Sequence, residues 1–239
     1  MGTWHRVYRC GWLLSRASPY LGARLQYMAA LRISEPELHI LHRFARRDGL
    51  SLDIGANWGM YTAALLPLSR SVIAFEPNPV IVQKLRRAWP GVRVEACALG
   101  AEAGSATLQV PVMTNGKQSH GWGSIRKEGF LCDAAGVVTY DVPVHRLDDF
   151  ALDGVGFIKI DVEGFEELVL DGAMETIRRD RPALLVEASE PPRTVARLEA
   201  LGYKAEYLHD GGLHPFSEWH PELRTRRGGP PNNMLFTPN

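Results

Sequence analysis

Short apolar runs alternate with amphipathic segments along most of the chain. Leu50–Ile54, an apolar run stopped by a glycine, predicts a buried strand, and the apolar residues of Trp58–Leu68 recur at helical spacing. Further strands are expected at Ser71–Phe75, Val92–Cys97, Phe157–Asp161, Ala183–Glu187, Lys204–His209 and Met234–Thr237, and further helices at Pro79–Trp89, Glu163–Arg178 and Pro192–Leu201. Because this alternation builds βαβ units, we expect a doubly wound α/β fold with a mostly parallel sheet and helices on both faces.

Two regions depart from this alternation. Residues 100–145 are rich in glycine and hold the β-prone pieces Ala106–Val112 and Val137–Val144, which predict an inserted hairpin and a mobile loop. Residues 1–48 read as helix, loop, helix, with Ser34 as the N-cap of the second helix. We therefore expect a helical N-terminal extension followed by one α/β domain that begins at residue 49.

Composition and charge exclude several classes of protein. The 239 residues are 45 % hydrophobic and have a formal net charge of zero, so a general nucleic-acid binder is not expected. The extension is basic, with eight arginines and two glutamates before residue 48; a solvated helix face or contact with a membrane surface or partner would both explain this. The three cysteines are widely spaced, and we find neither a secretory signal pattern nor an apolar stretch that could span a membrane. We expect reduced thiols and a cytoplasmic protein.

The segment Asp53–Gly59 follows the first predicted strand and opens a helix. Its glycines, Gly55 and Gly59, let the backbone turn sharply and approach a ligand closely. The spacing differs from the GxGxxG pattern of dinucleotide sites and fits the S-adenosylmethionine (SAM) loop of class I methyltransferases better. A glycine pair alone is more often only a structural turn between a strand and a helix.

An acidic residue at the end of the second predicted strand strengthens the ligand interpretation. Glu76 lies 21 positions after Gly55, where a carboxylate can accept hydrogen bonds from both hydroxyls of a ribose. Either NAD or SAM would use such a residue.

A third group of polar residues ends the predicted strand Phe157–Asp161. Ligands of open α/β sheets bind outside the carboxyl ends of the strands, so Asp161 and Glu163 should face the same crevice as Glu76. Lys159 alternates with apolar neighbours on this strand and should pair with an acid. Two acids could hold a divalent cation, but such pairs are common without metal, and we expect no metal site.

Several motifs in this order resemble the FkbM family of SAM-dependent methyltransferases. They are Asp53–Gly59, Ala74–Pro77, Ala98-Leu99-Gly100, Leu147–Phe150, Ile158–Gly164, Arg181-Pro182 and Leu184–Glu187. The resemblance covers about residues 50–210. It implies a class I methyltransferase (Rossmann-like) fold, SAM as the cofactor, and transfer of a methyl group to a hydroxyl of a small molecule or glycan.

The resemblance also implies roles for individual residues. The cofactor-binding set is Asp53, Gly55, Ala56, Asn57, Gly59, Glu76, Ala98 and Leu99. The loop Thr114–Ile125 would close over the acceptor, with Gly123 and Ser124 in contact and Glu163 on the acceptor side. Asp161 is the first candidate for the catalytic base, and His120 and His145 follow. Trp58 inside the glycine loop departs from the family pattern.

Three other functions compete with this interpretation. An NAD-dependent oxidoreductase would need the missing GxGxxG pattern. An amino methyltransferase would need an Asn/Asp-Pro-Pro-aromatic stretch, where this chain has Asp161-Val162-Glu163-Gly164. A SAM-binding module without catalysis would bind the cofactor and transfer nothing.

Overall fold

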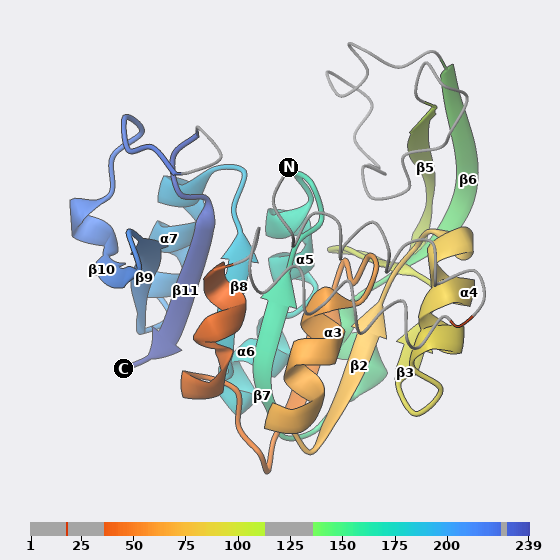
Figure 1. The fold of residues 1–239 in the computed structure, drawn as a ribbon, viewed down its shortest axis with the longest axis horizontal. Helices are drawn as coiled ribbons and strands as arrows, with labels where there is room; N and C mark the ends of the chain where they lie inside the picture. Colours follow the sequence, from red (N-terminus) through yellow and green to blue (C-terminus); the bar gives the residue numbers. More distant parts are fainter. Residues whose placement is uncertain (1–17, 19–35, 113–135, 226–228) are drawn as a thin grey trace.

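The structure, a computed structural model, describes residue 18 and residues 36–112, 136–225 and 229–239. An eight-stranded sheet runs through its centre in the order β10-β9-β11-β8-β7-β1-β2-β3 (Figure 1). The strands are β1 (Leu50–Ile54), β2 (Ser71–Phe75), β3 (Arg93–Glu95), β7 (Val155–Ile160), β8 (Ala183–Glu187), β9 (Tyr203–His209), β10 (Gly212–Pro215) and β11 (Asn233–Pro238). This is the mostly parallel sheet that the alternating pattern predicts.

The parallel part of the sheet comprises β3, β2, β1, β7 and β8. β11 inserts antiparallel between β8 and β9, and β10 pairs antiparallel with β9. All carboxyl ends of the parallel strands therefore lie at one edge, with β1 next to both β2 and β7. In an open α/β sheet this edge is where ligands bind.

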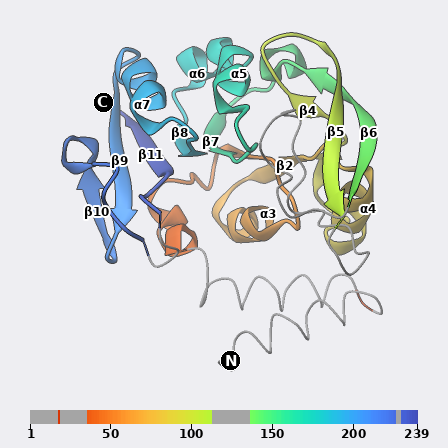
Figure 2. The ribbon, with the colours of Figure 1, turned by 90° about the horizontal axis from the view of Figure 1, so that it is seen from above.

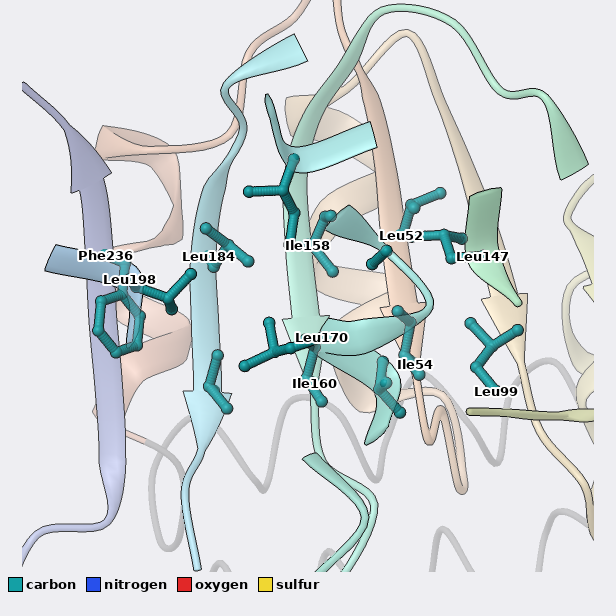
Figure 3. Packing of buried hydrophobic residues seen from close by; sticks show 14 of the residues in the cluster. Leu52, Ile54, Leu99, Leu147, Ile158, Ile160, Leu170, Leu184, Leu198 and Phe236 are labelled. Carbon is teal, nitrogen blue, oxygen red and sulfur yellow. The ribbon is translucent and has the colours of Figure 1, made fainter. Parts of the chain in front are cut away.

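Helices cover both faces of the sheet (Figure 2). They are α3 (Met60–Leu65), α4 (Pro79–Ala88), α5 (Glu166–Asp171), α6 (Met174–Asp180) and α7 (Pro191–Glu199). Successive strand residues alternate between the two faces: Ile158 and Leu184 pack with Leu170 of α5 and Leu198 of α7 (Figure 3), whereas Leu185 packs with α3 on the opposite face. The fold is doubly wound, as the sequence predicts.

A small second sheet extends the molecule beyond β3. It contains β4 (Ala98–Leu99), β5 (Gly104–Val112) and β6 (Gly136–His145) in the order β4-β6-β5. β5 and β6 form a long antiparallel ladder that projects as a ribbon (Figure 1). β5 and β6 lie where the two β-prone pieces were expected, while the loop expected at Thr114–Ile125 lies outside the described residues.

Two elements differ in their extent from the sequence prediction. The single helix predicted over Glu163–Arg178 is two helices, α5 and α6. Gly172 lies between them, at a point where a Cβ would lie 2.0 Å from the carbonyl oxygen of Gly100. The first of the two helices also starts later than predicted, since Glu163 and Gly164 have positive φ angles of 50° and 91°. The strand predicted at Val92–Cys97 is shorter, Arg93–Glu95 in the main sheet, and the short strand Ala98–Leu99 in the small sheet was not predicted.

The remaining differences lie at the two ends of the chain. Two 3-10 helices, Pro36–His39 and Leu41–Arg43, stand where the second helix of the extension was expected, and most of residues 1–48, Ser34 included, lies outside the described residues. β10 was not predicted. The sequence does contain a signal for this strand: an Asp-Gly pair, Asp210-Gly211, is typical of a two-residue hairpin turn. In the structure these two residues form that turn, and both have positive φ.

Candidate functional site

A cavity of about 310 Å³ opens at the carboxyl ends of β1, β2, β7 and β8. Most of the residues expected to bind cofactor or acceptor line it: Asp53, Gly55, Ala56, Asn57, Glu76, Ala98, Leu99, Asp161 and Glu163. They come from segments that are far apart in the sequence, and the parallel register of the sheet brings them together. The volume lies at the lower end of the range that small-molecule sites occupy.

The loop between β1 and α3 runs directly against the end of β7. Gly55 has a φ of +77°, and its N–H and that of Ala56 both donate to the carbonyl oxygen of Phe75 at 3.0 Å. A Cβ at Gly55 would lie 1.8 Å from the carbonyl oxygen of Asp161. Only glycine fits at this close approach, so Gly55 is what allows the loop and Asp161 to border the same cavity.

Gly59 was expected to bind cofactor, but it does not line the cavity. It has a φ of +78° at the start of α3, and a Cβ there would lie 2.7 Å from a methyl of Leu85 and 3.1 Å from the indole nitrogen of Trp89. Its role in the fold is therefore the close packing of α3 on α4.

Trp58, the residue that departs from the family pattern, lies partly against the α3–α4 cluster and also lines the cavity. The ammonium of Lys84 on α4 lies 4.2 Å from the centre of its ring. This cation–π contact joins the glycine loop to α4 at the cavity wall.

Glu76 is held at the end of β2 by backbone groups. Its Oε2 accepts a hydrogen bond from the N–H of Asn57 and its Oε1 from the N–H of Asn78, both at 2.8 Å. Burial raises the pKa of this carboxyl to about 7, and the two hydrogen bonds oppose the rise. Each oxygen accepts one of these bonds and retains further acceptor capacity toward the cavity, as recognition of a vicinal diol requires.

Asp53 is the acid at the other side of the glycine loop. It is 2 % exposed, and its Oδ2 accepts a hydrogen bond from the hydroxyl of Thr62 at 2.5 Å. Burial raises its pKa to about 6, which the hydrogen bond from Thr62 and the charge of Lys159 oppose. Asp53 thus offers a fixed acceptor at the start of the loop.

The end of β7 supplies an acid that is more exposed than Asp53 or Glu76. The side chain of Asp161 is 34 % exposed, and its Oδ2 lies 3.7 Å from Nζ of Lys159, whose side chain is 1 % exposed. The predicted pairing of the buried lysine with an acid is thereby confirmed. Burial raises the pKa of Glu163, two residues further on.

Sequence reasoning missed Glu187 at the end of β8. It lines the cavity, its Oε1 accepts a hydrogen bond from the side-chain amide of Asn232 at 2.9 Å, and burial raises its pKa to about 7. Because β8 is the parallel neighbour of β7, its carboxyl end lies at the same edge of the sheet, and the reasoning that identified Asp161 applies to Glu187 as well.

Cys97 was also not predicted. Its thiol is free and lines the cavity, and burial raises its pKa to about 12.

Some of the family-like motifs serve the fold and lie away from the cavity. Asp148 accepts hydrogen bonds from the backbone N–H groups of Glu175 and Thr176 at the start of α6, at 3.1 and 2.9 Å. Arg181 donates to the carbonyl oxygens of Leu201 and Gly202 beneath α7. Both side chains connect segments that are distant in sequence, which explains the motifs without a catalytic role.

The acceptor side is described only in part. His120, Gly123 and Ser124 lie outside the described residues. His145 is exposed, with its ring edge-to-face on Phe150, and is absent from the cavity lining. Within residues 36–112, 136–225 and 229–239, no group of three potential ligands suits a metal ion, and no helix is long and apolar enough to cross a membrane.

The residues around the cavity fit SAM. Glu76 presents a carboxylate with free acceptor capacity, Gly55 allows the backbone to border the cavity without side-chain bulk, and Ala98 and Leu99 supply small apolar surface nearby. The acids that surround the cavity also suit a cofactor with cationic groups.

Comparisons with known proteins agree with this geometry. The sequence model of the Methyltransferase FkbM domain matches residues 53–212. The methyltransferase sdnD of Sordaria araneosa is 29 % identical over 209 residues, which cover 72 % of this chain and 77 % of that protein. The crystal structure of a methyltransferase FkbM from Methylobacillus flagellatus KT superposes with a TM-score of 0.51 at 18 % identity; the match covers 97 % of this chain and 59 % of that one. The chain belongs to the family of FkbM methyltransferases, and its cofactor is S-adenosylmethionine.

Proposed function

We propose that the protein transfers the methyl group of SAM to a hydroxyl oxygen of a small molecule or glycan. The observation that carries this proposal is the position of Asp161, a carboxylate that borders the cavity at the end of β7 and is more exposed than Asp53 or Glu76. An acceptor that enters the cavity can reach this carboxylate, whereas Asp53 and Glu76 are only 2 % and 7 % exposed.

The residues at the ends of β1 and β2 would hold the cofactor. Glu76 would accept hydrogen bonds from the ribose hydroxyls, and Asp53 would face the cationic amino group of the methionine part. Gly55, Ala56 and Asn57 would border that part with their backbone. Ala98 and Leu99 would lie against the adenine.

Asp161 would take the proton of the acceptor hydroxyl. When bound, SAM supplies a methyl group on a positively charged sulfur, which keeps the electron pair of the broken carbon–sulfur bond as the acceptor oxygen forms its new bond to carbon. A sugar hydroxyl is a weak nucleophile, and a base within hydrogen-bond reach accelerates such reactions by roughly 10²–10⁴-fold. The walls of the cavity would align the acceptor and exclude water.

The chain does not favour a planar amino group as the acceptor. The Asn/Asp-Pro-Pro-aromatic cradle of amino methyltransferases is absent from the sequence after β7, where Asp161 and Glu163 stand. A carboxylate at this place can accept both a hydrogen bond and a proton from a hydroxyl. The predicted acceptor loop with Gly123 and Ser124, His120 as an alternative base, the helical extension of residues 1–48 and the cytoplasmic location remain predictions.

A labelling experiment tests the proposal. The protein is incubated with SAM carrying a ¹³C-methyl group and a panel of monosaccharides, oligosaccharides and hydroxylated small molecules, together with amine-bearing analogues of each. We expect a new methyl ether, recognised by its ¹³C chemical shift and by its survival in alkali. Methylation of nitrogen, or of no acceptor while SAM binds, would contradict the assignment to oxygen or to an enzyme.

A further inference from the structure

Glu187 is an acid in the wall of the cavity to which the proposed reaction gives no role. It ends β8 and is partly exposed, and its Oε1 accepts a hydrogen bond from the side-chain amide of Asn232 at 2.9 Å. The backbone oxygen of Asn232 in turn accepts the N–H of Ala188 at 2.8 Å, so the carboxylate is anchored beside its own strand. A carboxylate accepts more than one hydrogen bond, and Glu187 therefore retains acceptor capacity toward the cavity.

The order of the strands separates Glu187 from the residues assigned to the cofactor. The sheet runs β8-β7-β1-β2, and the acids assigned to SAM, Asp53 and Glu76, stand at the ends of β1 and β2. Asp161 ends β7, between these two acids and Glu187. An acceptor that reaches Asp161 from the side away from the cofactor therefore meets Glu187.

Asp161 and Glu187 occupy matching positions on two paired strands. β7 and β8 run parallel with Ile160 opposite Val186, and each carboxylate belongs to the next residue of its chain segment. Burial raises the pKa of Glu187, and the charge of Asp161 adds to the rise because the two groups are close. Since neighbouring strands lie about 4.8 Å apart, one ring-shaped acceptor can contact both carboxylates.

A buried acid holds the two strand ends in a fixed relation. Glu166 is 3 % exposed, and its Oε1 accepts the N–H of Gly164, which follows β7, at 2.6 Å. Its Oε2 lies 3.4 Å from the N–H of Ser189, which follows β8, and accepts from it. Because the segments that carry Asp161 and Glu187 are joined in this way, little ordering is needed when an acceptor binds to both.

We propose that Glu187 is a specificity-determining residue, which accepts a hydrogen bond from a hydroxyl adjacent to the one that is methylated. The acceptor is then a vicinal diol on a sugar ring. The proposal rests on the proposed function, in which Asp161 faces the reacting hydroxyl. Hydrogen bonds from hydroxyls to carboxylates are charge-assisted and strong, so a ring that donates to both acids is favoured over one with a single hydroxyl.

The test maps hydroxyl groups of the ligand onto residues of the protein. The full chain, loaded with S-adenosylhomocysteine at pH 8, is titrated with the methyl glycosides of glucose, galactose, mannose, fucose and rhamnose, and binding is followed by ligand-observed NMR. For the glycoside that binds most tightly, each hydroxyl is replaced by hydrogen in a separate analogue. Dissociation constants of the whole set are then measured for the native chain, E187Q and D161N.

The variants are chosen to leave the surroundings intact. Glutamine keeps the size of the side chain and an oxygen for the amide of Asn232, so E187Q removes the charge and not that contact. E190Q is the matched control, because Glu190 lies in the segment that follows β8, is exposed and does not line the cavity. If E187Q does not fold, E187D takes its place, since a shortened side chain no longer reaches the same hydroxyl.

Two deoxy analogues, with the missing hydroxyls on adjacent carbons, should bind the native chain roughly tenfold more weakly or worse, the scale of one charge-assisted hydrogen bond. E187Q should bind the parent glycoside more weakly by a similar factor and should be nearly indifferent to the loss of one of these hydroxyls. D161N should be nearly indifferent to the loss of the other. E190Q should match the native chain, and every variant should retain its affinity for S-adenosylhomocysteine.

The proposal is overturned if no glycoside binds the native complex, if E187Q keeps the native response to every missing hydroxyl, or if the two sensitive hydroxyls are not adjacent. Tighter binding of an analogue with an amino group in place of either hydroxyl would also overturn it, because the recognised group would then be a cation. Binding needs no methyl transfer. Failure of the proposed function would therefore be seen separately, as the absence of a methyl ether in the labelling experiment.

Discussion

The carboxylate of Glu76 gives the sharpest prediction about cofactor binding. E76Q keeps the size of the side chain but removes its charge and one acceptor oxygen. The loss of charge-assisted hydrogen bonds to the ribose costs about 1.5–3 kcal/mol. Since each 1.4 kcal/mol is a factor of ten, we expect SAM to bind roughly 10–150 times more weakly.

The alanine variant E76A would affect the fold as well as cofactor binding. Both carboxylate oxygens accept backbone N–H groups, of Asn57 and Asn78, and the residue is 7 % exposed. Alanine leaves these two N–H groups without their acceptor, so E76A should lower the melting temperature of the cofactor-free protein as well as weaken SAM binding.

The pKa of Glu76 adds a second signature. Burial raises this pKa to about 7, so the ionised fraction grows roughly tenfold between pH 6 and pH 8. If the ionised form holds the ribose, the affinity of the native chain for SAM rises by about that factor over this range, and the affinity of E76Q rises less.

Calorimetry at several pH values measures both effects. E95Q is the matched control, since Glu95 ends the adjacent strand β3, pairs with Arg93 and does not line the cavity. NAD serves as the ligand that should not compete. Native affinity for SAM in E76Q, or tighter binding of NAD than of SAM by the native chain, would refute the reasoning.

Two further predictions concern the loop and the buried acids. G55A should bind S-adenosylhomocysteine far more weakly and should melt at a lower temperature, because a Cβ at this residue, whose φ is +77°, would lie 1.8 Å from the carbonyl oxygen of Asp161. G91A is the control, since nothing lies within 4 Å of the added atom. Equal behaviour of the two variants would contradict the account. The cofactor-free protein should lose stability as pH rises from about 4.5 through about 7, because burial raises the pKa of Asp53, Glu76 and Glu187, and a raised acid pKa favours the fold only while the group is protonated. Thermal melts across this range test the sign: the slope should be shallower in E187Q, and a native melting temperature that increases throughout would show that other groups dominate.

The sequence predicted the centre of the fold because its signals there are local. Leu50–Ile54, Ser71–Phe75 and Ala183–Glu187 are apolar runs that end at a turn or a polar residue, and each is a strand with those bounds. The cavity followed from topology, since parallel strands carry their carboxyl ends to one edge.

What the sequence did not predict depends on contacts between distant segments. Between α5 and α6, Gly172 approaches Gly100 so closely that a Cβ there would lie 2.0 Å from the carbonyl oxygen of Gly100. Gly59 contributes to packing and not to the cavity lining, because Leu85 of α4 and Trp89, which follows α4, lie against it. Glu187 was missed because the argument stopped at β7, although the same reasoning applied to the next strand.

The measurement that tests the account most directly is the single-turnover rate of methyl transfer in D161N, with SAM saturating and the hydroxyl acceptor found by the labelling panel. Asparagine keeps the shape of the side chain and removes the proton acceptor. We predict a rate lower by about 10²-fold or more, with the affinity for S-adenosylhomocysteine little changed. A native rate, or loss of S-adenosylhomocysteine binding in a folded D161N protein, would contradict the role of Asp161 as the base.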